Sequence, residues 1–363
     1  MHMSDALVSP GVGGAMWAAS AGLAAWSARR LREEMTDARV QLMGVLGAFV
    51  FAAQMVNFAI PGTGSSGHLA GGLLLAILLG PHAAFLAMFS ILTVQALFFA
   101  DGGLLALGCN AFNLGFWPCF VVYPLVFRRM VGDKPGRGRL TFAAVLAGAI
   151  GLQLGAFGVV LQTLFSGISE LPFGTFALLM QPIHLAIGIV EGLVTAALLA
   201  FVWKARPELV LPSATGPVAR PTSMRPVLVA FAALALVTGG LFSWFASTRP
   251  DGLEWSSAGT CGREEPAVLQ DRWHRLCAGI QEWTAFLPGY DFKSSTTDGE
   301  PVAAAAAGTP EAAREPEESG APHPAVSSGT SLSGVVGGAI VLALIAMVGL
   351  GLRLRGRAEQ AGG

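Results

Sequence analysis

The sequence is poor in charged residues. Only 12% of its 363 residues carry a charge, whereas 53% are hydrophobic. Water-soluble domains contain about 25% charged residues, so this composition excludes an ordinary soluble enzyme. The apolar stretches are also long enough to cross a lipid bilayer instead of filling a small soluble core.

The common catalytic signatures are absent as well. The chain has no GxxxxGK[ST] loop and therefore does not hydrolyse ATP by that route. It also lacks GxSxG, HExxH and CxxC patterns, which leaves an intramembrane enzyme without a recognisable catalytic pair. No feature indicates a nucleic-acid partner.

Nine apolar segments are predicted to span the membrane. They cover residues 11–28, 40–60, 69–80, 83–100, 104–127, 140–166, 176–203, 226–246 and 333–352. The third has about 12 residues and, at about 1.5 Å per residue, is much shorter than the ~30 Å hydrocarbon core. It is expected to be a short or re-entrant helix that lines a cavity and ends at Gly80-Pro81.

The basic residues predict the orientation. Sixteen of the 22 Lys and Arg residues lie in segments 29–39, 128–139, 204–225 and 353–357. The other six fall in the long segment 247–332, and long domains are translocated with little regard to charge. We therefore expect a multi-pass protein of the bacterial plasma (inner) membrane with an extracytoplasmic amino terminus and a cytoplasmic carboxyl terminus.

The predicted fold class is an all-α integral membrane protein. Residues 1–205 form a seven-helix transmembrane bundle, residues 206–225 a cytoplasmic linker, and residues 226–363 a two-helix hairpin with a small extracytoplasmic domain. The hairpin consists of the last two spans, the outer domain 247–292 and the tether 294–332. The tether is rich in Ala, Pro, Glu and Ser and is predicted to be disordered.

Two cysteines lie in the outer domain. The oxidising exterior would allow Cys261 and Cys277 to form a disulfide. Their spacing does not establish the Cα separation, so a disulfide and two free thiols are equally compatible with the sequence.

The amino terminus is a candidate metal site. The amine of Met1, together with the main-chain and imidazole nitrogens of His2, can close fused chelate rings around one divalent ion. A further imidazole, His68, follows a Gly/Ser loop on the same predicted face. Planar nitrogen coordination suits Ni(II) or Cu(II). Asn57, Ser65 and Ser66 are the nearest groups that could orient the ligands, although helix capping is an alternative role for them.

Several stretches resemble a known family. They are MHMSDALVSP, FVFAAQMVNFAIPGTGSSGHLAGGLLLAILLGP, VQALFFADGGLLALGCNAFNLG and HLAIGIVEGLVTAALLAF. They are similar to the substrate-binding (S) component of energy-coupling-factor ABC transporters for nickel and cobalt. The segment RPDGLEWS, with an apolar span on each side, resembles the PDGLE-type small auxiliary subunit of these transporters, fused here to the carboxyl side.

This resemblance implies a ligand set, a substrate and partners. It assigns metal binding to Met1, His2 and His68, although the family usually reads MHIPDG where this chain has MHMSDA. The implied function is high-affinity capture and import of Ni(II) or Co(II) as the transported substrate, with no bound cofactor. The implied partners are a transmembrane coupling subunit and paired ATP-binding subunits, and the choice between nickel and cobalt stays open.

Polar residues within the spans leave an alternative function open. A self-sufficient secondary metal carrier or channel would need ionisable residues along a path through the bilayer. Only His184 and Glu191 qualify. They could form a metal relay, but we favour the alternative that they are a hydrogen-bonded pair that joins two helices. His274 is assigned to the outer domain, outside the bundle. The small residues Gly44, Ala48 and Ala52 form a stripe that suits either a partner or any packed helix.

Overall fold

The computed structural model describes residues 2–32, 34–132, 136–210, 223–264, 266, 269–292 and 328–362. Met1, most of the predicted linker 206–225 and most of the predicted tether 294–332 lie outside these residues. The described residues are mostly helical and contain one two-stranded sheet, which confirms the all-α prediction.

The described part of residues 1–205 is built mainly from helices. They are α1 (Pro10–Leu31), α2 (Asp37–Gln54), α3 (Gly72–Leu79), α4 (Pro81–Phe98), α5 (Leu107–Ala111) with its π-helical continuation η2 (Phe112–Phe127) and α6 (Arg128–Val131), α7 (Arg137–Ser166) and α8 (Phe173–Ala205). A short helix, α9 (Pro207–Val210), follows α8. A short 3-10 turn, η1 (Asp5–Leu7), precedes α1.

Local sequence explains where these helices begin and end. Pro10 occupies the first turn of α1, and the Ser9 side chain caps it by accepting from the Val12 amide. Gly80, with a positive φ of 79°, separates α3 from α4, which begins at Pro81. The predicted break at Gly80-Pro81 is therefore confirmed, because glycine adopts this backbone conformation readily and proline starts the next helix.

Among the described residues, five helices are long and apolar enough to cross a membrane by length and composition. They cover Pro81–Phe98, Leu107–Val131, Arg137–Ser166, Phe173–Ala205 and Gly329–Gly356. The multi-pass prediction is confirmed at this level, whereas the crossing of the other four segments stays a prediction. The second predicted span is too long at its carboxyl end, because α2 ends at Gln54 and residues 55–60 lie in a loop instead of continuing the helix.

The close approach of α7 and α8 positions the polar residues of α8. A Cβ atom on Gly148 would lie 2.9 Å from the Cα atom of Gly192, and one on Gly192 would lie 2.4 Å from the Cα atom of Val145. Only glycine allows two backbones to approach this closely. The inner face of α8 is thereby fixed against the bundle, with His184 and Glu191 buried.

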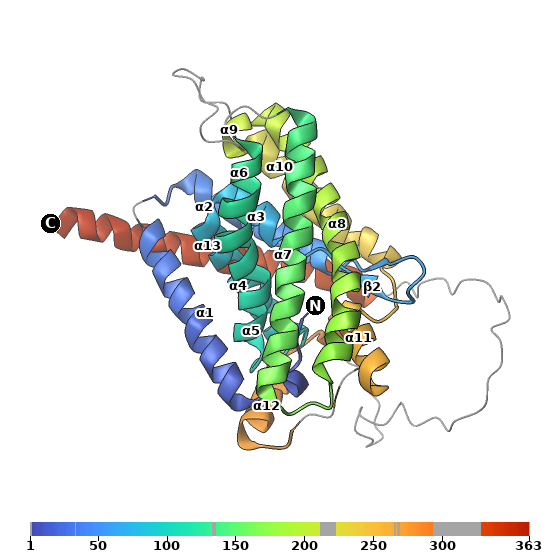
Figure 1. Ribbon diagram of the computed structural model, residues 1–363. Coiled ribbons are helices and arrows are strands. Elements are labelled where there is room, and N and C mark those ends of the chain that lie inside the picture. Colours follow the sequence, from blue (N-terminus) through green and yellow to red (C-terminus); the bar gives the residue numbers. More distant parts are fainter. Residues whose placement is uncertain are drawn as a thin grey trace.

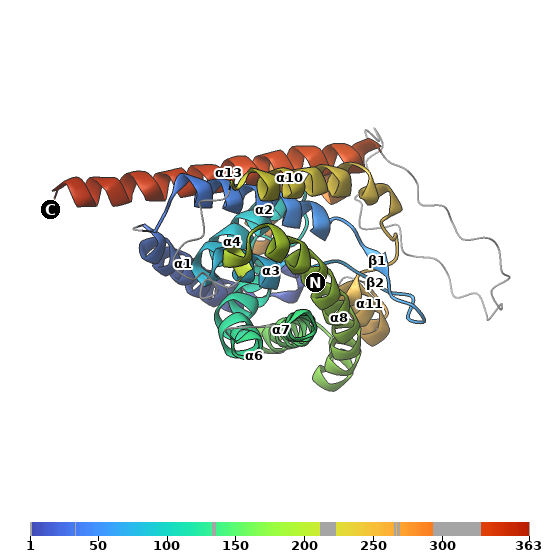
Figure 2. The same cartoon turned by 90° about the horizontal axis from the view of Figure 1, so that it is seen from above.

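The carboxyl-terminal region packs on α2 through its two long helices, α10 and α13. It comprises α10 (Arg225–Gly240), η4 (Phe242–Phe245), α11 (Gly252–Cys261), α12 (Arg272–Thr284), η5 (Pro288–Tyr290) and α13 (Ser328–Gly362). Figure 2 shows α10 and α13 side by side along α2. Gly44 and Ala48 of the small-residue stripe face Leu342 and Gly338 of α13. Within the chain, this stripe is a packing surface for the fused hairpin.

The outer-domain elements gather at one end of the molecule. Figure 1 shows α11 and α12 at the end opposite α6 and α9. Cys261 and Cys277 are free thiols in the structure, both partly exposed, so the disulfide alternative is not adopted.

Candidate metal site

Two histidines far apart in sequence meet at the amino-terminal end of the bundle. The rings of His2 and His68 are stacked, with their centroids 5.0 Å apart and their planes 17° from parallel. Both histidines are largely buried: the side chain of His2 is 6% exposed, and residue His68 as a whole is 8% exposed. The predicted pairing of His2 with His68 is thus present in the geometry.

An asparagine holds the amino-terminal segment in place. The Met3 amide donates to Asn110 Oδ1 at 2.8 Å, and Asn110 Nδ2 donates to the Met3 carbonyl at 3.1 Å. The Gly103 amide also donates to that carbonyl at 2.9 Å. These bonds form a specific clamp one residue from His2.

His274 reaches the same segment from the outer domain. It lies on α12, is 1% exposed, and donates from Nε2 to the carbonyls of Asp5 at 3.0 Å and Val8 at 3.1 Å. It therefore links the outer-domain helix α12 to the amino-terminal turn, a contact that the sequence analysis did not predict. A helix more than 260 residues away supplies hydrogen bonds to the amino-terminal turn, and local sequence gives no signal for this.

Asp101 is a site residue that the sequence analysis missed. Its Oδ1 atom lies 2.9 Å from His2 Nδ1, and its other oxygen accepts from the Tyr290 hydroxyl of η5. Burial alone would raise the pKa of Asp101, but the charge and hydrogen bond of His2, with the Tyr290 bond, lower it to about 2. A carboxylate therefore faces the His2 imidazole.

His68 is held as a neutral ligand-type imidazole. Its Nδ1 lies 3.2 Å from the Leu69 carbonyl, which can only accept, so the proton is on Nδ1. Burial lowers the pKa of His68 to about 3, and the nearby His2 adds to this effect. A neutral imidazole with its second nitrogen unprotonated has the chemical form that binds a metal.

The loop that carries His68 is a small hairpin. Strand β1 (Phe58–Ala59) pairs antiparallel with β2 (Ser66–Gly67), with Phe58 opposite Gly67. Gly62 and Gly64 in the turn both have positive φ values, of 76° and 75°. The glycines of the Gly/Ser loop therefore give the reversal that returns the chain to the bundle one residue before His68.

The predicted orienting residues lie in a hydrogen-bonded loop, in which the Ser65 and Ser66 side chains bond to main-chain carbonyls. Ser65 Oγ donates to the Ser66 carbonyl at 3.1 Å, and Ser66 Oγ donates to the Arg249 carbonyl at 2.8 Å. The Asn57 carbonyl accepts from the Ser247 amide at 2.7 Å. These bonds fix the loop and join it to residues 247–250, and the orienting role of Asn57, Ser65 and Ser66 stays a prediction.

The PDGLE segment closes over the site. Asp251 and Glu254 form a reciprocal capping box at the start of α11, which explains the acidic residues of this motif. Asp251 and Gly252 then line a small cavity together with Gly67, His68 and His184. The fused auxiliary region therefore contributes part of the wall around the predicted metal site.

His184 and Glu191 do not form the expected pair. His184 Nδ1 bonds to the Met180 carbonyl of its own helix at 2.8 Å. The Glu191 oxygens accept from the amides of Ala70 at 2.9 Å and Gly71 at 3.2 Å. Glu191 thus joins α8 to the start of α3, but without His184.

Within the described residues, no three His, Cys, Asp or Glu side chains converge on a preformed metal cage. The predicted ligand set does not need one, because it uses main-chain nitrogen and the terminal amine. Met1 lies outside the described residues, so its contribution stays a prediction. Two of the three predicted ligand residues, His2 and His68, are brought together by the fold.

Comparison with known proteins gives two family matches. Residues 2–209 match the model of the cobalt uptake substrate-specific transmembrane region, and residues 225–354 match the PDGLE domain. The fused nickel transport protein NikMN of Rhodobacter capsulatus is 33% identical over 316 residues, covering 80% of this chain and 88% of that protein. The cobalt transport protein CbiM of Sorangium cellulosum is 31% identical over 192 residues, covering 50% of this chain and 80% of that protein.

A solved structure agrees with these matches. The crystal structure of a truncated transition metal transporter superposes with a TM-score of 0.50 at 28% sequence identity. It covers 56% of this chain and 99% of the solved chain.

Proposed function

Because the chain belongs to the cobalt uptake substrate-specific transmembrane family and carries a fused PDGLE domain, we propose that it captures Ni(II) or Co(II) for import. It is a component of a metal transporter and not an enzyme. The observation that carries the proposal is the stacking of His2 on His68, which are 66 residues apart in the sequence.

The proposed ligands are the Met1 amine, the main-chain and imidazole nitrogens of His2, and His68. Two chelate rings share the His2 amide nitrogen. One closes through the Met1 amine and the other through Nδ1 of His2. In the structure His2 Nδ1 faces Asp101, and Nε2 has no hydrogen-bond partner among the described residues. A half-turn of the ring would bring Nδ1 to the metal and leave Nε2–H to donate to Asp101, which is a typical arrangement for a ligating histidine.

The energy for import would come from partner subunits. The chain has no phosphate-binding loop. We therefore propose a transmembrane coupling subunit and paired ATP-binding subunits of the energy-coupling-factor type. Figure 1 shows α11 and α12 at the end opposite α6 and α9. Arg128 and Arg129 lie on α6, and Lys204 and Arg206 lie close before α9, so the positive-inside rule supports an extracytoplasmic position for α11 and for the site that it covers.

Calorimetry with Ni(II) on the purified full chain tests the ligand set. His68→Ala removes an imidazole, and one alanine inserted before Met1 converts the ligating amine into an amide. Each change should weaken binding at least 100-fold, because each removes a nitrogen of the same chelate. His82→Ala, which alters a histidine near the other end of the bundle, and one alanine added at the carboxyl end are the controls.

Tight Ni(II) binding by the amino-terminally extended chain would contradict the chelate. Uptake into vesicles then tests the partners. We expect uptake only when the coupling and ATP-binding subunits are present with ATP. Uptake by this chain alone would support the self-sufficient carrier instead.

A further inference from the structure

A second histidine faces the cavity beside His68. His184 lies on α8, is fully buried, and its Nε2 atom has no hydrogen-bond partner. Burying a polar atom without a partner is unfavourable, and such an atom in a native fold calls for an explanation. The ligands proposed above leave His184 unused.

The proton position of His184 favours metal binding. Its Nδ1 lies 2.8 Å from the Met180 carbonyl, which only accepts hydrogen bonds. The Nδ1 atom must therefore carry the proton, and Nε2 presents a lone pair. Metal-ligating histidines usually donate their other N–H to a carbonyl in this way, which fixes the ring and its tautomer.

The lone pair is directed at a confined space. His184, His68, Asp251 and Gly252 all line one cavity with a free volume of about 10 Å³. This is close to the volume needed to hold one water molecule, and a metal ion is of similar size. A Cβ atom on Gly252 would lie 3.3 Å from His184 Nε2 and 3.0 Å from its Cε1. The PDGLE segment therefore covers His184 directly.

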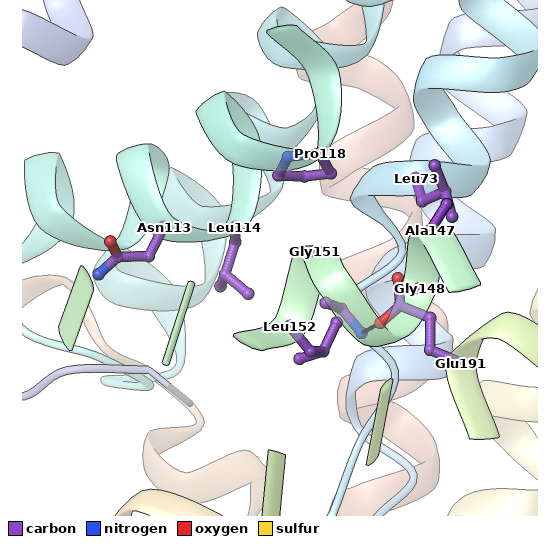
Figure 3. Close-up of a pocket in the computed structure, with 10 residues that line it drawn as sticks. Leu73, Asn113, Leu114, Pro118, Ala147, Gly148, Gly151, Leu152 and Glu191 are labelled. Atoms are coloured by element: carbon purple, nitrogen blue, oxygen red, sulfur yellow. Dashed lines mark hydrogen bonds between the residues drawn. The ribbon is translucent and has the colours of Figure 1, made fainter. Parts of the chain in front are cut away.

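A second cavity in the bundle shares part of its lining with the first. Both are lined by Ala70, Leu114 and Leu152, and the second also contains Glu191 and Asn113. Figure 3 shows Glu191 extending from α8 toward this cavity, near Gly148 and Gly151 of α7. The Glu191 oxygens already accept two backbone bonds, which leaves His184 as the available ligand next to His68.

We propose that His184 is a second, transient ligand that receives the transported metal from His68 on its way into the bundle. The inference rests on the proposed function. His184 takes no part in the initial high-affinity chelate. It accepts the ion when the PDGLE segment moves away from the cavity, so its loss affects transfer and not capture.

The first test separates binding from uptake. His184→Leu removes the nitrogen ligand and fills a similar volume, and His82→Leu is the matched control. In the full chain, His184→Leu should bind Ni(II) within twofold of the parent and unfold at the same or a higher temperature, because the change removes an orphaned polar atom. With the partner subunits present, uptake should fall at least tenfold, whereas His82→Leu keeps it.

Unchanged uptake by His184→Leu would overturn the proposal. It would show that the unsatisfied nitrogen of His184 is not needed for transport and that this histidine has only a structural role. Failure of the proposed function looks different: the parent chain itself would then neither bind nor import Ni(II).

A second test detects ligation directly with Cu(II) as the probe. In His68→Ala, His184 should take the vacated position with weaker affinity, and electron paramagnetic resonance should count four nitrogen donors. The double variant His68→Ala/His184→Leu should show three. Identical spectra for the two variants would overturn ligation by His184.

Discussion

The Asn110 clamp gives a prediction whose magnitude follows from the structure. Asn110→Leu removes both side-chain bonds to Met3, which measure 2.8 and 3.1 Å. Each of these hydrogen bonds makes a net contribution of about 1 kcal/mol to stability. The substitution also leaves the buried Met3 amide without an acceptor, at a further cost of about 1 kcal/mol. The Met3 carbonyl keeps its bond from Gly103 and adds no such penalty.

The clamp therefore stabilises the docked amino terminus by about 2–3 kcal/mol, which corresponds to roughly 30- to 150-fold in affinity. The assay is Ni(II) calorimetry on the full chain. Because the amino-terminal segment must be docked for His2 to stack on His68, Asn110→Leu should weaken binding by that factor.

The matched control is Asn113→Leu, three residues along the same helical region. Asn113 and Gln162 exchange two hydrogen bonds of 2.7 and 3.2 Å, and Asn113 makes only a long contact to the Met3 sulfur. This change should lower thermal stability to a similar extent but reduce affinity less than threefold. Equal affinities for Asn110→Leu and Asn113→Leu would refute the reasoning that Asn110 positions the ligand segment.

Three further predictions concern pH, stability and topology. The pKa of His68 is about 3 in the folded chain and about 6.5 when the chain is unfolded. Between these pH values the unfolded state binds more protons, so the free energy of unfolding should fall as the pH is lowered from 6.5 toward 3. His68→Gln lacks this titrating group and should show a shallower decline in melting temperature over the same range. In Glu191→Gln, the side-chain amide cannot accept both backbone bonds at the start of α3, which costs about 1.5–3 kcal/mol of stability. The melting temperature should therefore fall by about 2–6 °C. An unchanged melting temperature would show that this cap is dispensable. Cys261 and Cys277 should react with a membrane-impermeant thiol reagent added outside intact cells without prior reduction, whereas labelling only from the cytoplasmic side would reverse the proposed orientation.

Local chemistry in the sequence was enough to predict the helical framework. Long apolar runs predicted the helices, and Gly80-Pro81 predicted the boundary between α3 and α4, because these signals depend on neighbouring residues. The pairing of His2 with His68 was also accessible, since the chelating chemistry of a chain-terminal histidine needs one further imidazole. The exact end of α2 was not, because residues 55–60 are apolar enough for a span yet enter a loop.

The surroundings of the site depended on contacts between distant residues. Asn110 clamps Met3 across 107 positions, His274 bonds to Asp5 across 269, and Tyr290 bonds to Asp101 across 189. None of these residues has a local pattern that names its partner. Each hydrogen bond forms only after the helices have packed and excluded water, when a buried polar group must find whichever partner the fold places nearby. The sequence by itself therefore determined the helices and indicated the two histidines of the candidate site, and only the tertiary structure decided which groups hold and cover them.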